Sequence, residues 1–72
     1  MTKTYPEVAA QFGQRLRKIR ESKGISQEKL ANESGLDRTY VSGIERGRRN
    51  PSLINISKLA KGLNVKITDL FN

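Results

Sequence analysis

The stretch that decides the fold runs from residue 26 to residue 50 and reads SQEKLANESGLDRTYVSGIERGRRN. Ser26 suits the N-cap of a helix, because its hydroxyl can accept a hydrogen bond from an otherwise unpaired amide of the first turn. Gly35 can adopt the left-handed conformation that ends a helix at little cost, and Asp37 can then cap a second helix. Two short helices joined by a tight turn containing glycine predict a helix-turn-helix.

The second of these helices carries a polar face opposite its apolar residues. Val41 and Ile44 lie three residues apart and therefore share one side of the helix. The residues at or after its start that lie away from this side are Arg38, Thr39, Ser42 and Gly43. A recognition helix reads base edges mainly from its N-terminal half, so these four residues are candidate DNA base contacts. A solvated helix face remains the alternative.

Three arginines crowd the segment that follows. Arg46, Arg48 and Arg49 lie around Gly47 and before Pro51, which together predict a loop. A loop after a recognition helix is well placed to meet the sugar–phosphate backbone, where arginine can bind bidentately. These arginines are therefore candidate phosphate contacts, and a solvated loop is the alternative.

The charge balance points in the same direction. The chain has 72 residues with 14 Lys and Arg against 7 Asp and Glu, a formal net charge of +7. A strongly basic domain suits nucleic acid, although an anionic membrane or an acidic protein also fits. No apolar run approaches the roughly 20 residues that span a bilayer, and the N-terminus lacks the apolar core of a signal peptide. We expect a cytoplasmic protein.

Two residue types that often carry chemistry are missing from the chain. Cysteine is absent, which excludes disulfides and thiolate chemistry, and histidine is absent, which removes the commonest metal ligand and general base. No plausible constellation of nucleophile and base remains. We therefore expect no enzyme activity, no metal, no cofactor and no small-molecule effector.

The rest of the chain also carries helical patterns. Thr4 and Glu7 fit a capping box, and Ser52 can cap a later helix. An apolar stripe at spacings of four, four and three comprises Val8, Phe12, Leu16 and Ile19. No segment alternates with a period of two for long, so the fold class is all-α. We expect one domain over residues 1–72, with helices at roughly 5–23, 27–34, 38–46, 53–62 and 67–71.

The C-terminus is unusually apolar for so small a domain. Its last eight residues include Val65, Ile67, Leu70 and Phe71. One short terminal segment cannot easily bury all four inward, and an exposed apolar patch usually marks an interface. These residues are therefore candidates for a homodimer interface, and closure of the monomer core is the alternative.

Many of these residues belong to one pattern, which spans roughly residues 9–71. It consists of Arg17-x-x-Arg20, Ser26-Gln27-x-x-Leu30-Ala31, Ser34-Gly35-Leu36, Arg38-Thr39-Tyr40-Val41-Ser42, Ile44-Glu45-Arg46-Gly47, Arg49-Asn50-Pro51-Ser52-Leu53 and Leu59-Ala60. With this pattern the sequence resembles the Cro and phage-repressor family of helix-turn-helix proteins. Within that family it looks most like the small controller proteins of restriction–modification systems.

The resemblance implies a compact five-helix, lambda-repressor-like domain that binds double-stranded DNA. It implies a sequence-specific transcription regulator that acts as a homodimer on a pseudo-palindromic operator and controls restriction–modification genes, including its own. It further implies that Gln27 contacts phosphate and that Arg20 and Glu45 form an ion pair between the first and third helices. Gly43 stands where related proteins often carry a long polar side chain. An antitoxin-like DNA-binding protein, whose main task is to bind a protein partner, is the alternative.

Overall fold

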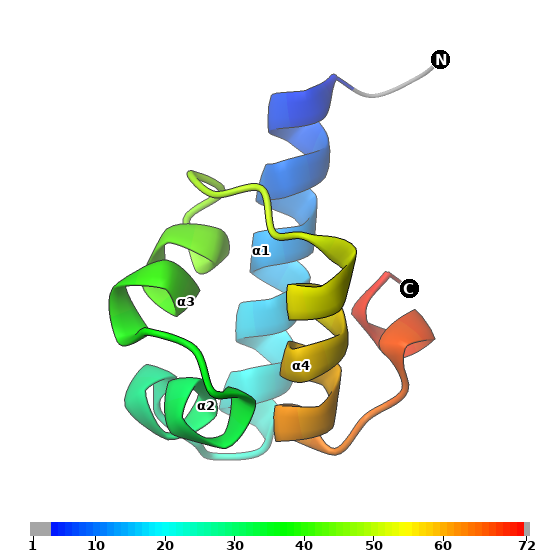
Figure 1. Ribbon diagram of the computed structural model, residues 1–72. Helices are drawn as coiled ribbons and strands as arrows, with labels where there is room; N and C mark the ends of the chain where they lie inside the picture. Colours follow the sequence, from blue (N-terminus) through cyan, green and yellow to red (C-terminus); the bar gives the residue numbers. More distant parts are fainter. Residues whose placement is uncertain (1–3, 72) are drawn as a thin grey trace.

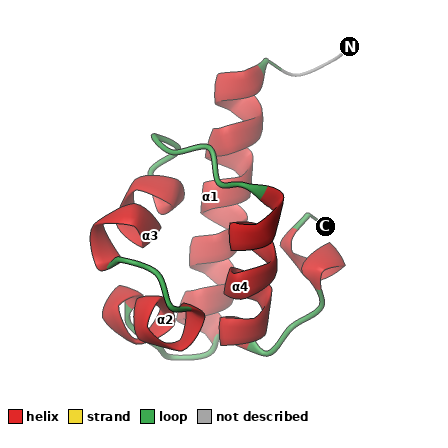
Figure 2. Cartoon of the chain, viewed as in Figure 1, coloured by secondary structure: helices red, strands yellow, loops and turns green. Residues whose placement is uncertain are grey.

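The computed structural model describes residues 4–71, which form four α-helices and a short 3-10 helix, with no strand in that range (Figure 1, Figure 2). The elements are α1 (Tyr5–Ser22), α2 (Gln27–Ser34), α3 (Arg38–Glu45), α4 (Leu53–Leu63) and the 3-10 helix η1 (Ile67–Leu70). The all-α prediction is confirmed, whereas the prediction of five α-helices is wrong.

The last segment differs from the prediction because of its hydrogen bonds. The amide of Asp69 donates to the carbonyl of Lys66 at 2.9 Å, and the amide of Phe71 donates to the carbonyl of Thr68 at 3.1 Å. Both bonds join residues three apart, the pattern of a 3-10 helix. The segment is therefore a single tight turn of four residues.

Helix α1 forms the long axis of the molecule, and the other elements pack around it (Figure 1). Helix α3 and η1 both contact α1, while α2 contacts both α3 and α4. Helix α3 therefore has α1 behind it and α2 beside it. This arrangement leaves one long side of α3 at the surface of the molecule (Figure 1).

Local sequence explains where three of the helices begin. The Thr4 hydroxyl accepts from the amide of Glu7 at 3.3 Å, and the Glu7 carboxylate accepts from the amide of Thr4 at 3.0 Å. The Ser26 hydroxyl accepts from the amide of Lys29 at 3.0 Å, and Ser52 caps α4 in the same way. Each cap satisfies an amide that has no partner inside its helix.

The start of α3 is different. Asp37 occupies the N-cap position, but its carboxylate makes no bond to a backbone amide of the first turn. It accepts instead from the hydroxyl of Thr39. The expected cap residue is in place, and its side chain is directed to a neighbouring side chain.

Two left-handed residues end α2 and α4. Gly35 has a φ of +66° and follows α2, as the sequence predicts. Asn64 has a φ of 57° and follows α4, which runs through Gly62 and Leu63 rather than ending at residue 62. Asparagine tolerates this conformation better than most residues other than glycine, so it can end a helix.

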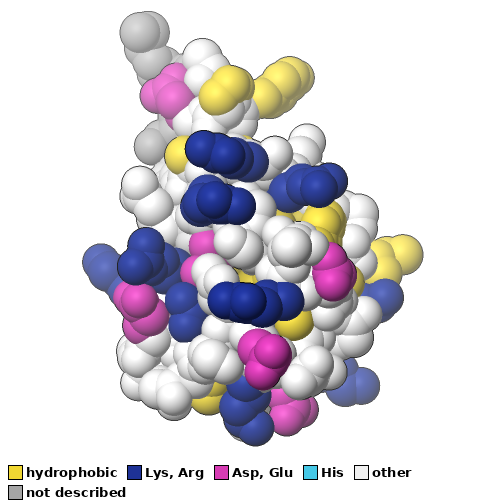
Figure 3. All heavy atoms as spheres, turned by 90° about the vertical axis from the view of Figure 1, so that its left-hand side faces the viewer, with side chains coloured by type: hydrophobic (Ala, Val, Ile, Leu, Met, Phe, Trp, Pro, Cys, Tyr) yellow, Lys and Arg dark blue, Asp and Glu magenta, His cyan; other side chains and the backbone are white. Residues whose placement is uncertain are grey.

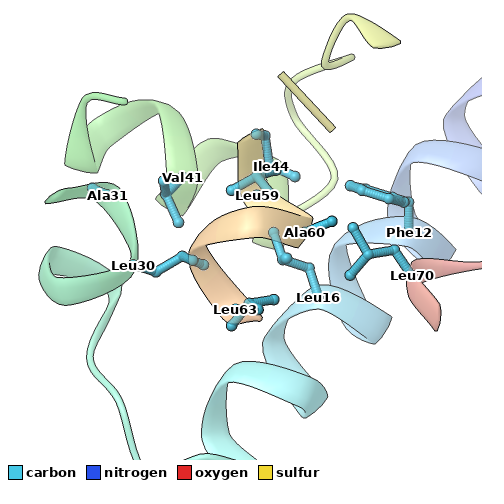
Figure 4. Packing of buried hydrophobic residues seen from close by; sticks show 10 residues of the cluster. All are labelled: Phe12, Leu16, Leu30, Ala31, Val41, Ile44, Leu59, Ala60, Leu63 and Leu70. Carbon is cyan, nitrogen blue, oxygen red and sulfur yellow. The ribbon is translucent and has the colours of Figure 1, made fainter. Parts of the chain in front are cut away.

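The core joins all five elements. Its largest fully buried side chains are Leu16, Leu30, Val41, Ile44, Leu59, Leu63 and Leu70. Side chains from α1, α2, α3 and α4 point toward one another, and Phe12 and Leu70 lie together at one end of the cluster (Figure 4). Val8 is 49% exposed, so the buried stripe of α1 begins at Phe12 and not at Val8.

Helices α1 and α3 approach each other closely at Gly13. A Cβ atom added to this buried glycine would collide with the carbonyl oxygen of Ile44 and would lie 2.9 Å from that of Glu45. The absence of a side chain at this position therefore sets the distance between the two helices. It places the end of α3 directly against α1.

Residues 4–71 lack two kinds of feature. No helix in this range is long and apolar enough to cross a bilayer. The same range holds no group of three or more acidic, histidine or cysteine side chains that could bind a metal ion.

Candidate nucleic-acid interface

The N-terminal half of α3 presents polar side chains to solvent. Arg38 and Thr39 are exposed and Ser42 is partly exposed, whereas Val41 and Ile44 on the opposite side are fully buried. The hydroxyl of Thr39 donates a hydrogen bond to the carboxylate of Asp37. The structure thus brings three of the four predicted base-contact residues to one accessible face.

Gly43 is placed differently from the prediction. It is buried, and the space above it is filled by the side chain of Arg49. A Cβ atom added to Gly43 would lie 2.6 Å from Cγ of Arg49. The prediction that Gly43 itself faces the bases is therefore corrected, because a side chain from the following loop covers this position.

The loop between α3 and α4 folds back along α3. Its turn is made by Gly47, which has a φ of +74° and packs against Ala10 of α1. The amide of Arg48 then donates to the carbonyl of Gly43 at 2.8 Å. Arg46, Arg48 and Arg49 are all exposed, and the side chain of Arg49 lies against Gly43 of α3.

Tyr40 is part of this surface, although the sequence analysis assigned it no role. Its hydroxyl accepts a hydrogen bond from Nδ2 of Asn55 in α4 at 3.0 Å. The guanidinium carbon of Arg49 lies 6.0 Å from the centre of its ring, at the limit of a cation–π interaction. The sequence did contain a signal for this role, because Tyr40 lies between the candidate base contact Thr39 and the buried Val41 and is followed by a basic loop.

Basic side chains are distributed over this side of the molecule (Figure 3). Figure 3 shows the face on which α2 and α3 lie in Figure 1, with Lys and Arg side chains spread from its upper part to its lower edge. Acidic side chains interrupt the basic ones toward the lower part of this face (Figure 3).

Arg20 and Glu45 tie the C-terminal end of α3 to α1. Nε of Arg20 donates to Oε2 of Glu45 at 2.6 Å, and its Nη2 donates to Oε1 at 3.0 Å. The Nη1 group of Arg20 donates to the carbonyl of Ile25 at 2.7 Å. Both charged residues are buried, and the hydrogen bonds to Glu45 raise the pKa of Arg20 above its ordinary value. The guanidinium therefore stays charged, and the pair orients α3.

Gln27 belongs to the same network. Its Nε2 donates to Oε1 of Glu45 at 3.0 Å, and the residue is partly buried at the start of α2. One of the two hydrogens of this side-chain amide is thus bound to the carboxylate that orients α3. Gln27, Arg20 and Arg38 together line one open hollow between the start of α2 and the start of α3.

The predicted interface residues at the C-terminus divide into two groups. Leu70 is 1% exposed and belongs to the core, so its assignment to a dimer interface is corrected. Val65 is half-buried against the same core. Ile67 and Phe71 remain exposed at 37% and 58%. Leu70 is buried because the turn of η1 directs its side chain into the core.

Phe71 continues an apolar surface that extends along α1. Its ring centre lies 5.3 Å from that of Phe12, and it lines a shallow cavity together with Tyr5 and Val8. The segment is held in place by Nε of Arg15, which donates to the carbonyl of Asp69 at 3.0 Å. The exposed apolar surface therefore joins both ends of the described chain.

The chain is similar to a known protein family and to several individual proteins. Residues 16–70 match a family described as helix-turn-helix. The control protein C.BamHI of Bacillus amyloliquefaciens is 58% identical over 62 residues, which cover 85% of this chain and 76% of that protein. The crystal structure of the restriction–modification controller protein C.AhdI from Aeromonas hydrophila is 57% identical with a TM-score of 0.89, covering 90% of this chain and 98% of that one.

A further solved structure includes nucleic acid. C.Esp1396I bound to a 19 base pair DNA duplex is 43% identical to this chain with a TM-score of 0.82. The match covers 88% of this chain and 84% of that one. With the family match extending over most of its length and these close similarities to control proteins, the chain belongs to the helix-turn-helix family.

Proposed function

We propose that this protein is a sequence-specific DNA-binding transcription regulator that controls restriction–modification genes, including its own. The observation that carries the proposal is the exposed N-terminal half of α3, bordered by a loop with three exposed arginines. Its similarity to control proteins, one of which has been seen on a DNA duplex, supports the same role. A helix presented in this way fits the major groove.

The side chains divide by the part of DNA that they would meet. Arg38, at the first position of α3, suits a bidentate contact with O6 and N7 of guanine. Thr39 offers its methyl group to the methyl group of thymine, and Ser42 can bond to any base edge. Arg46, Arg48 and Arg49 would bind phosphates and set the register of the protein on the duplex. Gln27 would approach a phosphate from the start of α2.

We also propose that the protein acts as a homodimer on a pseudo-palindromic operator. One α3 helix reads only a few base pairs, whereas a two-fold dimer presents two such helices about 34 Å apart, one turn of DNA. The exposed apolar surface of Tyr5, Val8 and Phe71, with Ile67 on the same C-terminal segment, is the part of the protomer that a second copy would cover.

The dimer is tested by sedimentation at micromolar concentration. Phe71→Asp places a charge on the exposed surface and removes one ring contact, with Phe12 at the edge of the core, so we expect a folded monomer by sedimentation and circular dichroism. A variant that still sediments as a dimer would show that another surface is used. Leu70→Asp is unsuitable, because it would bury a charge in the core.

DNA recognition is tested by footprinting on the DNA upstream of the protein's own gene, followed by binding measurements. Arg38→Ala should weaken binding to the protected site by about 1–3 kcal/mol, or about 5- to 150-fold, and relax the preference at one base position. Binding to random DNA should fall much less. An equal loss on both duplexes would assign Arg38 to phosphate contact, and the absence of any protected site would refute the proposed function.

A further inference from the structure

Gly43 has no evident structural reason to be a glycine. It lies within α3, where glycine is less favourable than alanine, and it is not among the glycines with a positive φ. No backbone atom of another element lies nearer to an added Cβ than 3.6 Å. The three heavy atoms nearest to an added Cβ all belong to the side chain of Arg49.

The path of the loop brings Arg49 to this position. Gly47 turns the chain against α1, and the bond from the amide of Arg48 to the carbonyl of Gly43 draws the loop onto α3. The side chain of Arg49 then lies across Gly43, with Cγ at 2.6 Å and Nε at 3.5 Å from the position of an added Cβ. Its guanidinium extends toward the ring of Tyr40, three residues nearer the start of α3.

The support beneath the guanidinium is itself fixed. The hydroxyl of Tyr40 is bonded to Asn55 of α4, so the ring is held between two helices. Cγ, Cδ and Nε of Arg49 thus lie over Gly43 of α3, whereas its neighbour Arg48 is attached to α3 through its backbone amide. A side chain that is ordered before binding loses less conformational entropy when it binds.

We propose that Gly43 is a positioning residue for Arg49, and that the two act as one unit in DNA binding. The missing side chain at Gly43 leaves the space in which Arg49 lies, and Tyr40 supports its guanidinium beside the exposed half of α3. The inference rests on the proposed DNA-binding function and adds a residue that touches no DNA. Gly43 contributes to affinity only through Arg49.

The substitution Gly43→Ala should affect the stability of the fold and its affinity for DNA in different ways. Gly43→Ala improves the helix propensity of α3, and the atom that must move to admit the new methyl group belongs to the side chain of Arg49, so the melting temperature should stay unchanged or rise by up to about 8 °C. The same variant should bind the operator duplex roughly 2- to 12-fold more weakly, the equivalent of ordering one long side chain during binding. A structural glycine would show the opposite, with lower stability and lower binding together.

A double-mutant cycle, measured by fluorescence anisotropy on the footprinted duplex, tests the coupling. In an Arg49→Ala background, Gly43→Ala should cost less than a further factor of about two in affinity, since the positioned side chain is gone. In a matched Arg48→Ala background, the full loss caused by Gly43→Ala should remain. Equal losses in both backgrounds, or no loss in the wild-type background, would overturn the proposal.

A measurement on the free protein keeps the inference separate from the proposed function. In the wild-type protein, NMR should show contacts between the side-chain protons of Arg49 and both the α-protons of Gly43 and the ring of Tyr40. Gly43→Ala should abolish them, while Arg48→Ala should preserve them. Wild-type protein that shows these contacts but binds no duplex would overturn both proposals, whereas duplex binding without coupling would overturn only the positioning role.

Discussion

The substitution Glu45→Gln should strongly destabilise the fold. Glu45 accepts three hydrogen bonds, two from the guanidinium of Arg20 at 2.6 and 3.0 Å and one from Nε2 of Gln27 at 3.0 Å. Its side chain is 2% exposed and that of Arg20 is 10% exposed. The substitution therefore leaves a positive charge in a site that water hardly reaches.

The geometry of the site makes both orientations of the glutamine amide unfavourable. If its nitrogen replaces Oε2, it faces the Nε donor of Arg20. If its nitrogen replaces Oε1, it faces the Nη2 donor of Arg20 and the Nε2 donor of Gln27. Either orientation sets a donor against a donor and also removes the charge that balances Arg20.

Breaking one member of a buried ion pair costs about 3–5 kcal/mol. For a domain of this size each 1 kcal/mol corresponds to roughly 4–8 °C, so the melting temperature should fall by at least about 12 °C. The total stability of 72 residues is on the order of 4–11 kcal/mol, so the loss is a large part of the whole.

Thermal unfolding followed by circular dichroism provides the assay, and the chain offers a matched control. Glu21 pairs with Arg17 at 3.2 Å on the surface of α1, with side-chain exposures of 55% and 63%. Glu21→Gln makes the same chemical change in an exposed pair, which is worth at most about 1 kcal/mol. Its melting temperature should stay close to that of the wild-type protein.

If the melting temperature of Glu45→Gln lay within 2–3 °C of the wild-type value, the loss of unfolding free energy would be only about 0.5 kcal/mol. That result would refute the reasoning. A second variant separates the cost of an unpaired charge from the loss of packing. Replacing both Arg20 and Glu45 by methionine removes the charges together, and such replacements are often neutral or stabilising. The double variant should therefore melt at a higher temperature than Glu45→Gln.

Three further outcomes follow from other parts of the structure. Ser34→Ala should raise the melting temperature, because the buried Ser34 hydroxyl beneath Gly62 has no hydrogen-bond partner among the described residues. Burying such an unpaired group costs about 1–3 kcal/mol, so an unchanged or lower melting temperature would contradict this expectation. Gly13→Ala should lower the midpoint of urea unfolding, since its Cβ collides with the carbonyl of Ile44, and an unaltered midpoint would show that α1 and α3 can separate freely. Arg48→Ala should reduce the slope of log affinity against log salt by about 0.9 if Arg48 binds a phosphate, and an unchanged slope would place it in solvent.

The ends of the helices could be predicted from the sequence because their chemistry is local. Ser26 and Ser52 each accept from an amide three residues later, and Gly35 adopts a conformation that depends on its own missing side chain. These cap residues and the glycine, together with apolar residues at helical spacing between them, were enough to predict the helix-turn-helix. The candidate base contacts Arg38 and Thr39 followed from the same pattern, because α3 buries the side opposite to them.

The apolar C-terminus shows where periodicity stops being informative. Ile67, Leu70 and Phe71 are equally apolar in sequence, yet only Leu70 is buried. Which of them faces inward depends on the direction in which η1 leaves α4, and on the bond between Arg15 and the carbonyl of Asp69, 54 positions apart. No local pattern carries that information, so the assignment of Leu70 to the surface was wrong.

The sequence by itself determined that this protein is helical, where its helix-turn-helix lies and which side chains α3 can offer to a groove, since each depends on neighbours within a few positions. Only the tertiary structure decided that Arg49 covers Gly43 and that Tyr40 supports it. These contacts require a loop to fold back onto a helix that α1 and α4 hold in place. Packing between distant segments, which has no signature at short range, sets that geometry.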